Sequence, residues 1–173
     1  IVRILDANDN APMIVAPQGI VQVDENQHAQ SFVVNVRAQD YDSGENGHVS
    51  YSLANEEDVP FSIDHFTGEV RTTKQLDFET EKRTWRLKVR ASDWGEPYRR
   101  QTEKLITVKV LDVNDNRPQF DKIDCTGTVA RSTPIGNEIL NVTAIDFDAD
   151  DVISYRIMGG NKDRCFSLNS ITG

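Results

Sequence analysis

The sequence predicts an all-β fold made of tandem domains. Two observations support this prediction: apolar and polar residues alternate with a period of two, and blocks of sequence recur at a nearly constant spacing. Over residues 84–91 charged or polar side chains alternate with apolar ones, which is typical of a strand with one buried face. No stretch keeps a helical period over several turns, so strands are favoured throughout the chain.

Seven strands are expected within the first complete domain. In chain order they cover 20–23, 34–39, 49–53, 61–63, 69–72, 84–91 and 104–110. Turn signals separate them at Asn46-Gly47, Thr67-Gly68 and Gly95-Glu96-Pro97. Seven alternating strands in roughly a hundred residues predict an immunoglobulin-like β-sandwich.

Three short blocks of sequence recur later in the chain in the same order. The pairs of blocks are 6–10 with 112–116, 40–42 with 146–148, and 67–68 with 172–173. Their shifts are 106, 106 and 105 positions (112 − 6, 146 − 40 and 172 − 67), which indicates a repeated domain. We therefore interpret the chain as a segment of a longer protein with three parts: the end of a preceding repeat and its linker in 1–10, a complete repeat with the following linker in 11–116, and the N-terminal half of the next repeat in 117–173.

The composition excludes several classes of protein. The 173 residues carry 19 Lys and Arg against 28 Asp and Glu, so the net charge is −9 and the isoelectric point is about 4.8. This balance argues against a nucleic-acid binder, which would show a basic stripe. Apolar residues make up 38% of the chain, and no apolar run is long enough to span a membrane. Two cysteines are too few for a cysteine-rich zinc module.

Acidic residues gather where the expected strands end and in the linkers. The members of this set are Asp6, Asp9, Glu25, Asp40, Asp42, Asp77, Glu79, Asp93, Asp112 and Asp115. Two carboxylates about 4 Å apart repel by roughly 4 kcal/mol at an effective dielectric constant of 20, so such a cluster needs a cation. Oxygen donors without histidine or cysteine select a hard ion. Calcium accepts irregular shells of about 6–8 oxygens, so the sequence predicts calcium as the ion.

These motifs resemble the extracellular repeats of the cadherin family over essentially the whole chain. The motifs that carry the resemblance are 112–116 with its copy at 6–10, Asp24-Glu25-Asn26, Asp40-Tyr41-Asp42, Leu76-Asp77-Phe78-Glu79 and Ala91-Ser92-Asp93. The resemblance implies that three calcium ions lie between successive sandwiches and stiffen the joint.

The resemblance also implies a ligand set for each linker. At the second linker, two ions would use Glu25, Asp77, Glu79, Asp115, Asp148 and the Val113 carbonyl. The third ion there would use Asn114, the Asn116 carbonyl, Asp146 and Asp148. The first linker would supply the corresponding set of Asn8, Asp9, the Asn10 carbonyl, Asp40, Asp42, the Asn46 carbonyl and Asp93. Its remaining ligands would belong to a preceding repeat, so we expect only partial occupancy at the first linker.

Two covalent features are expected in residues 117–173. Cys125 and Cys165 are an isolated pair, which in an extracellular module favours a disulfide; two buried, unpaired thiols are the alternative. This pair, together with 153–157, resembles the Fat-like giant cadherins, which are single-pass membrane proteins with long arrays of repeats. Asn141-Val142-Thr143 is an N-glycosylation sequon, and the alternation of this segment leaves Asn141 facing outward.

The expected function is that of an ectodomain segment on the outer side of the plasma membrane, whose parent is anchored elsewhere. Calcium would rigidify the joint between repeats and so support calcium-dependent cell–cell adhesion. The expected partners are other cadherin repeats, in cis or in trans, with no nucleic acid and no small-molecule substrate. A passive spacer within a large heterophilic polarity receptor is the alternative. An enzyme is disfavoured, because the sequence offers no Ser–His or Cys–His set, no phosphate loop and no zinc-type histidine pair.

Overall fold

The computed structural model describes residues 1–2, 4–15, 17–122, 124–149 and 151–173. The chain divides into two compact units, unit 1 (Ile1–Val113) and unit 2 (Asn114–Gly173). The division falls inside the repeated block 112–116 that the sequence marks as a linker. We describe each unit by itself.

Unit 1 contains every strand that the sequence predicts. In chain order its strands are β1 (Met13–Val15), β2 (Val21–Asp24), β3 (Phe32–Asn35), β4 (Arg37–Gln39), β5 (Ser50–Leu53), β6 (Phe61–Ile63), β7 (Glu69–Thr72), β8 (Thr84–Ser92) and β9 (Gln101–Leu111). A single turn of 3₁₀ helix, η1 (Gly44–Gly47), lies between β4 and β5. The all-β prediction is therefore confirmed.

The structure differs from the expected strands in two places. The segment expected as one strand over 34–39 is divided into β3 and β4 at Val36, whose N–H donates to the Gly68 carbonyl oxygen (2.9 Å). The sequence also did not predict β1, which pairs with β4 and places Ile14 opposite Ala38. A strand of three residues shows too little alternation to be recognised from the sequence alone.

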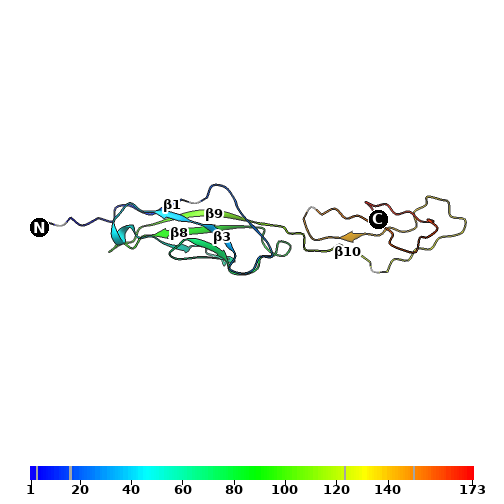
Figure 1. Ribbon diagram of the computed structural model, residues 1–173, viewed down its shortest axis with the longest axis horizontal. Helices are drawn as coiled ribbons and strands as arrows, with labels where there is room; N and C mark the ends of the chain where they lie inside the picture. The colour runs from blue at the N-terminus through cyan, green and yellow to red at the C-terminus, as the bar shows by residue number, and fades with distance from the viewer. Residues whose placement is uncertain (3, 16, 123, 150) are drawn as a thin grey trace. The chain divides into compact units, whose positions relative to one another are not determined.

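The strands of unit 1 form two main sheets (Figure 1). One has the order β2-β9-β8-β5 and the other the order β3-β7-β6, while β1 and β4 form a separate pair. β8 and β9 are antiparallel over their whole pairing, and β2 joins β9 in parallel. The two main sheets together supply the seven strands of a sandwich (4 + 3).

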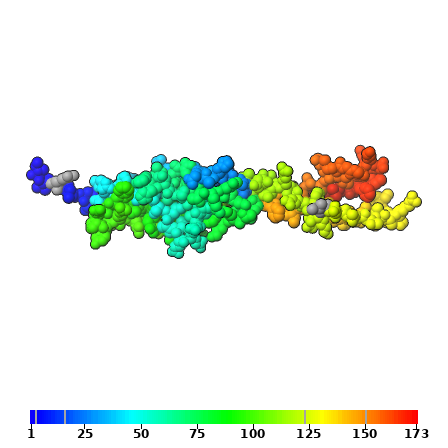
Figure 2. All heavy atoms as spheres, turned by 90° about the horizontal axis from the view of Figure 1, so that it is seen from below, coloured from blue at the N-terminus to red at the C-terminus, as the bar shows by residue number. Residues whose placement is uncertain are grey.

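The core of unit 1 lies between these sheets. β8 and β9 contribute Leu87, Val89 and Val108, none of which is exposed, and Val36 and Val70 join them from the other side. Burial of one such side chain contributes about 1.5–3 kcal/mol. In Figure 2 the cyan and green atoms, which belong to the strands of this unit, form one continuous mass. The core fixes the sheets, and the sheets fix the loops that carry the acidic residues.

Unit 2 repeats local features of unit 1 without a comparable core. Its described strands are β10 (Gln119–Phe120) and β11 (Ala144–Ile145), and Asp148 is the only buried residue among those described. The Tyr51 hydroxyl accepts from the Ala38 N–H (2.8 Å), and the Tyr155 hydroxyl accepts from the Ala144 N–H (2.9 Å). The repetition seen in the sequence is therefore also a repetition of hydrogen bonds.

The structure does not contain the expected disulfide. Cys125 and Cys165 are both free and exposed. The Cys125 thiol lies 3.7 Å from the Lys122 carbonyl oxygen, and the Cys165 thiol lies 3.9 Å from that of Asp163. Each sulfur thus contacts a carbonyl of its own loop, and the inference from cysteine count and compartment is not matched by the geometry. Among the described residues no helix has the length and apolar character of a membrane span.

Candidate metal centre

A carboxylate is buried at the end of β2 in unit 1. Glu25 follows the last residue of this strand, and its N–H continues the pairing with β9 by donating to the Leu111 carbonyl oxygen (3.0 Å). Its side chain is only 2% exposed. One carboxylate oxygen accepts from the Phe78 N–H (2.6 Å) and the other from the Val113 N–H (2.9 Å). Glu25 takes part in none of the ion pairs formed by the described residues.

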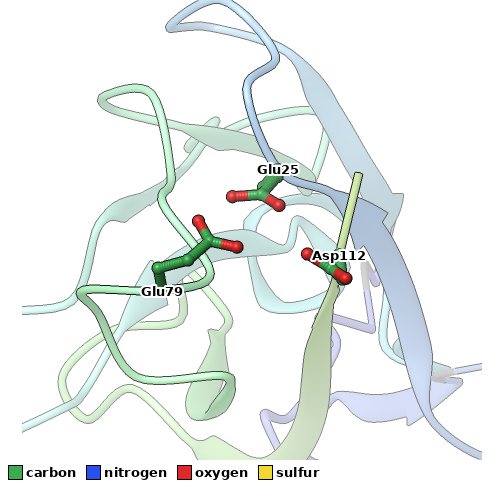
Figure 3. A group of neighbouring side chains, drawn as sticks. All are labelled: Glu25, Glu79 and Asp112. Carbon is green, nitrogen blue, oxygen red and sulfur yellow. The ribbon is translucent and has the colours of Figure 1, made fainter. Parts of the chain in front are cut away.

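Two further carboxylates approach Glu25 (Figure 3). Glu25, Glu79 and Asp112 each present one oxygen, and these oxygens all lie within 4.8 Å of one another. At such separations two carboxylates repel by roughly 4 kcal/mol at an effective dielectric constant of 20. Figure 3 shows the three side chains pointing toward a common space from three different segments. An oxygen-only set of this kind suits a hard cation.

Asp112 belongs to this group although the predicted ligand set omitted it. The signal was available, because Asp112 repeats Asp6 at the same shift of 106 as the other linker residues (112 − 6). Asp77, which the set included, is not part of the group. Asp77 instead accepts from the N–H groups of Glu79 (3.1 Å) and Thr80 (2.9 Å). The hydrogen bonds from Thr80 are the main cause of a lowered Asp77 pKa, and this turn positions Glu79.

A second group of predicted ligands meets at the segment 6–10 of unit 1. The Asn10 N–H donates to Asp42 (3.0 Å), and the Asn10 side-chain amide donates to both Asp42 and Asp9. The Asp42 N–H in turn donates to an oxygen of Asp40 (3.0 Å). Partial desolvation raises the pKa of Asp42, but the hydrogen bonds from Asn10 outweigh it and the pKa lies below its usual value. The carboxylate is therefore held in its charged form.

Two buried oxygens in this group lack a hydrogen-bond partner among the described residues. They are the Asn8 side-chain oxygen and the second carboxylate oxygen of Asp40. A buried acceptor that meets neither a donor nor water costs free energy, roughly 1–3 kcal/mol or more for a charged group. A cation that these oxygens coordinate would remove that cost.

The other predicted ligands of the first linker are placed differently. Asp93 is fully buried and accepts from the N–H groups of Gly95 (3.1 Å) and Arg100 (3.0 Å). The Asn46 side chain donates to Asp6 (3.0 Å), which the ligand set did not include. A Cβ added to Gly95 would lie 1.9 Å from the Asn8 side-chain nitrogen, so the Asp93 loop passes directly beside Asn8.

Unit 2 repeats the Asn–Asp arrangement of the first linker. The Asn116 N–H donates to Asp148 (3.1 and 3.2 Å), and the Asn116 side chain donates to Asp148 (2.6 Å) and Asp115 (2.8 Å). The Asp148 N–H donates to Asp146 (3.2 Å). The remaining oxygen of Asp146 is buried without a hydrogen-bond partner among the described residues, as is that of Asp40.

Asp151 joins this group in unit 2. Asp146, Asp148 and Asp151 each present an oxygen within 4.8 Å of the others, and Asn114 donates to both oxygens of Asp151 (3.1 and 2.9 Å). The sequence set did not include Asp151. It lies in the shortened loop that replaces the Asn46-Gly47 turn, so the shift of 106 did not point to it.

The donor sets of both units fit calcium. Every candidate ligand offers an oxygen, and each group brings together three carboxylates, which is the hard, anionic donor chemistry that calcium prefers. The orphaned oxygens of Asp40 and Asp146 occupy equivalent positions in two copies of one hydrogen-bonded frame. The same oxygen left without a donor in both copies is more readily explained by a common role in coordinating an ion than by two independent packing faults.

Comparison with known proteins agrees with this geometry. The family model described as "Cadherin domain" matches residues 20–111. The chain is 52% identical over 172 residues to the Fat-like cadherin-related tumor suppressor homolog of Drosophila melanogaster, and 45% identical over 173 residues to human Protocadherin Fat 1. These alignments cover 99% and 100% of this chain but 4% of each relative.

A solved structure shows the same similarity. The protocadherin gammaB7 EC3-6 cis-dimer structure is 29% identical with a TM-score of 0.88, over 97% of this chain and 43% of the other. The family match covers more than half of the residues, and it includes the strands from which the buried Glu25 and Asp93 extend. The chain belongs to the cadherin family, and its repeats are similar to those of the Fat-like cadherins.

Proposed function

We propose that this chain is a calcium-binding segment of a cell-surface cadherin ectodomain, in which bound calcium stiffens the linker 112–116 and so supports calcium-dependent cell–cell adhesion. Cadherin repeats are adhesion domains, and the acidic groups of both units could hold a metal ion. The chain spans about 4% of the curated relatives, so the partners and location of the whole protein are part of this proposal.

The observation that carries the proposal is the buried carboxylate of Glu25 beside Glu79 and Asp112. A glutamate that is 2% exposed and has no basic partner among the described residues is costly unless a cation compensates its charge. The Phe78 and Val113 N–H groups orient this carboxylate but carry no net charge. The chain thus prepares an anionic site before any ion binds.

The residues of the chain have distinct tasks in this proposal. Glu25, Glu79 and Asp112 would hold an ion in unit 1, and Asp146, Asp148 and Asp151 would hold one in unit 2. The ion supplies positive charge that cancels the repulsion among these carboxylates. Asn10 and Asn116 hold Asp42 and Asp148 in place through paired hydrogen bonds. Extracellular modules bind calcium at about 10⁻⁴ to 10⁻³ M, so the linker would stiffen outside the cell and loosen under chelation.

A calcium titration by calorimetry, with small-angle X-ray scattering at both ends of the titration, tests this function. We expect a dissociation constant of about 10⁻⁴ to 10⁻³ M, as in other extracellular modules. The scattering profile should indicate a less flexible particle once calcium is bound. The triple variant E25Q/E79Q/D112N removes the central acidic group, and the variant E56Q/E57Q/E96Q removes the same charge at exposed positions as a control. Absence of binding by the parent chain, or equal loss in both variants, would contradict the proposal.

A passive spacer remains the second candidate, and one observation favours it. The outer face of the β8–β9 pair carries charged and hydroxyl side chains, with Leu105 as its exposed apolar residue. A face of this kind lacks the apolar centre that stable protein interfaces use. Analytical ultracentrifugation with calcium distinguishes the two roles: a monomer at concentrations of about 100 μM supports the spacer, and a calcium-dependent dimer supports direct adhesion by these repeats.

A further inference from the structure

Basic side chains gather on the outer face of the β8–β9 pair in unit 1, by the register of these two strands. The two strands are labelled in Figure 1. Leu87 and Val89 are fully buried, so the alternation of the strand turns their neighbours Arg86 and Lys88 away from the core. Lys109 of β9 lies opposite Thr84 in the register, on this same face. We call Arg86, Lys88 and Lys109 the basic face.

The cations of the basic face form none of the ion pairs found among the described residues, although Glu56 and Glu57 line the groove beside two of them. Arg90, the next cation along β8, is paired with Glu103 at 2.6 Å, whereas Arg86, Lys88 and Lys109 appear in none of the ion pairs of the described residues. Arg86 and Lys88 are two positions apart on one strand, which separates their Cα atoms by about 7 Å. Lys109 is a diagonal neighbour of Arg86 across the pair, about 7–8 Å away. Three free cations therefore lie close together on a chain whose net charge is −9.

The backbone under two of these cations is held firmly. The Asn55 side chain donates to the Arg86 carbonyl oxygen (2.8 Å) and accepts from the Lys88 N–H (2.9 Å). An open groove next to these residues is lined by Arg86, Lys88, Leu105 and Trp85, and also by Glu56 and Glu57. Lys82, whose ammonium lies 5.4 Å from the centre of the Trp85 ring, pairs with Glu57 at 3.3 Å. The groove therefore carries charges of both signs, and the proposal rests on the cations of the basic face itself.

We propose that the basic face binds a sulfated polysaccharide of the cell surface or extracellular matrix. The face offers cations and hydroxyl groups but a single exposed apolar side chain, Leu105, so it suits a hydrophilic polyanion better than a protein. The polysaccharide assignment uses the extracellular location of that proposed function, but it does not depend on calcium binding.

Binding of the 173-residue chain to immobilised heparin tests this proposal, with the salt concentration varied in calcium-free buffer. The variant R86Q/K88Q should lose at least tenfold in affinity, and R86Q/K88Q/K109Q should lose more. Each lost contact should reduce the slope of log affinity against log salt by about 1 if counterion release operates as it does on nucleic acids. The control variant R71Q/K74Q removes the same charge from cations that pair with Glu69 and Glu81, and it should stay within twofold of the parent.

Three outcomes would overturn the proposal. The parent chain could fail to bind heparin at physiological salt, or the control could lose as much affinity as R86Q/K88Q, which would make the binding a general effect of net charge. A DNA oligonucleotide of matched charge could compete as well as heparin, which would remove the assignment to sulfated sugar. Thermal melting of all variants shows that they fold. A failed calcium titration with intact heparin binding would reject the proposed function and leave this proposal standing.

Discussion

Glu25 combines a carboxylate charge with nearly complete burial, and its two oxygens accept from the N–H groups of Phe78 and Val113. The substitution E25Q replaces one acceptor with an NH₂ group that faces an N–H donor. Because this leaves a buried donor unsatisfied, we expect a loss of about 1–3 kcal/mol in the free energy of unfolding when calcium is bound and cancels the repulsion from Glu79 and Asp112. Urea denaturation in saturating calcium measures this loss.

The neighbouring residue gives the matched control for this prediction. Asp24 precedes Glu25 in the chain but is exposed on β2, so D24N should change the free energy of unfolding by less than about 0.5 kcal/mol. A loss in D24N as large as that in E25Q would show that net charge, and not the buried hydrogen bonds, sets the stability.

Asn141 is exposed, as is Thr143, which completes its sequon. On secretion from a eukaryotic cell we expect one N-linked glycan there, removable by peptide N-glycosidase F and absent from N141Q. Unit 1 supplies a control at the position 106 residues earlier (141 − 106), where Asn35 and Arg37 are exposed around the buried Val36. The variant R37T creates a sequon at Asn35. A glycan at Asn35 in that variant, with none at Asn141, would reject the prediction.

At the scale of the element, the turn before β7 depends on one carboxylate. Asp64 accepts from the N–H groups of Phe66 (3.0 Å) and Thr67 (2.7 Å) and from the Thr67 hydroxyl (2.9 Å). The hydrogen bonds from Thr67 are the largest cause of a lowered Asp64 pKa. In unit 2 the equivalent side chain is Asn169, which accepts from the N–H groups of Ile171 and Thr172 (2.9 and 3.1 Å). The asparagine of unit 2 thus accepts the same type of hydrogen bonds as Asp64 but carries no charge.

This turn predicts a specific pH dependence. Because the folded pKa of Asp64 lies below the unfolded value near 3.8, its contribution to stability is present above that value and is lost as the pH falls through the folded pKa. The parent chain should therefore be more stable than D64N at pH 7, and the difference should shrink toward pH 3. Thermal melts of both proteins in chelator between these pH values test the prediction. A difference that stays constant with pH would contradict it.

At the scale of the whole molecule, the two units differ in how they could be stabilised. Unit 1 has an apolar core, whereas Asp148 is the only buried residue among those described in unit 2. An ion that binds only the folded chain raises its free energy of unfolding by about 2.7 kcal/mol at a concentration one hundred times Kd. We expect the melting temperature to rise with the logarithm of calcium concentration, as measured by calorimetry.

Magnesium provides the comparison for this prediction. It requires a nearly octahedral shell of oxygens at about 2.0–2.1 Å and gives up its bound waters reluctantly, so groups of protein carboxylates suit it less well than they suit calcium. Magnesium at the same concentration should therefore raise the melting temperature by less than half as much as calcium. Equal shifts with both ions would indicate general screening of the 28 acidic residues and not a specific site.

The sequence by itself determined the longer strands, the repeat and the oxygen chemistry of the candidate ion ligands. Alternation along 84–91 was enough to identify β8, because its apolar positions face one core, and the shift of 106 identified Asp40 and Asp146 as equivalent. These are local or periodic properties, which a linear pattern preserves. The short β1 and the break at Val36 were not visible, because each depends on which strand pairs with which.

Only the tertiary structure decided which side chains meet. Glu25, Glu79 and Asp112 come from three distant segments, and folding places their oxygens within 4.8 Å of one another, while Asp77 is used by its own turn. Strand pairing likewise brought Lys109 beside Arg86, which already alternates with Lys88 along β8 in the sequence. The structure also showed that the two cysteines are free, which their number and setting did not predict. Residue type and periodicity are written along the chain, but distances between segments far apart in sequence are set by how the sheets pair and pack.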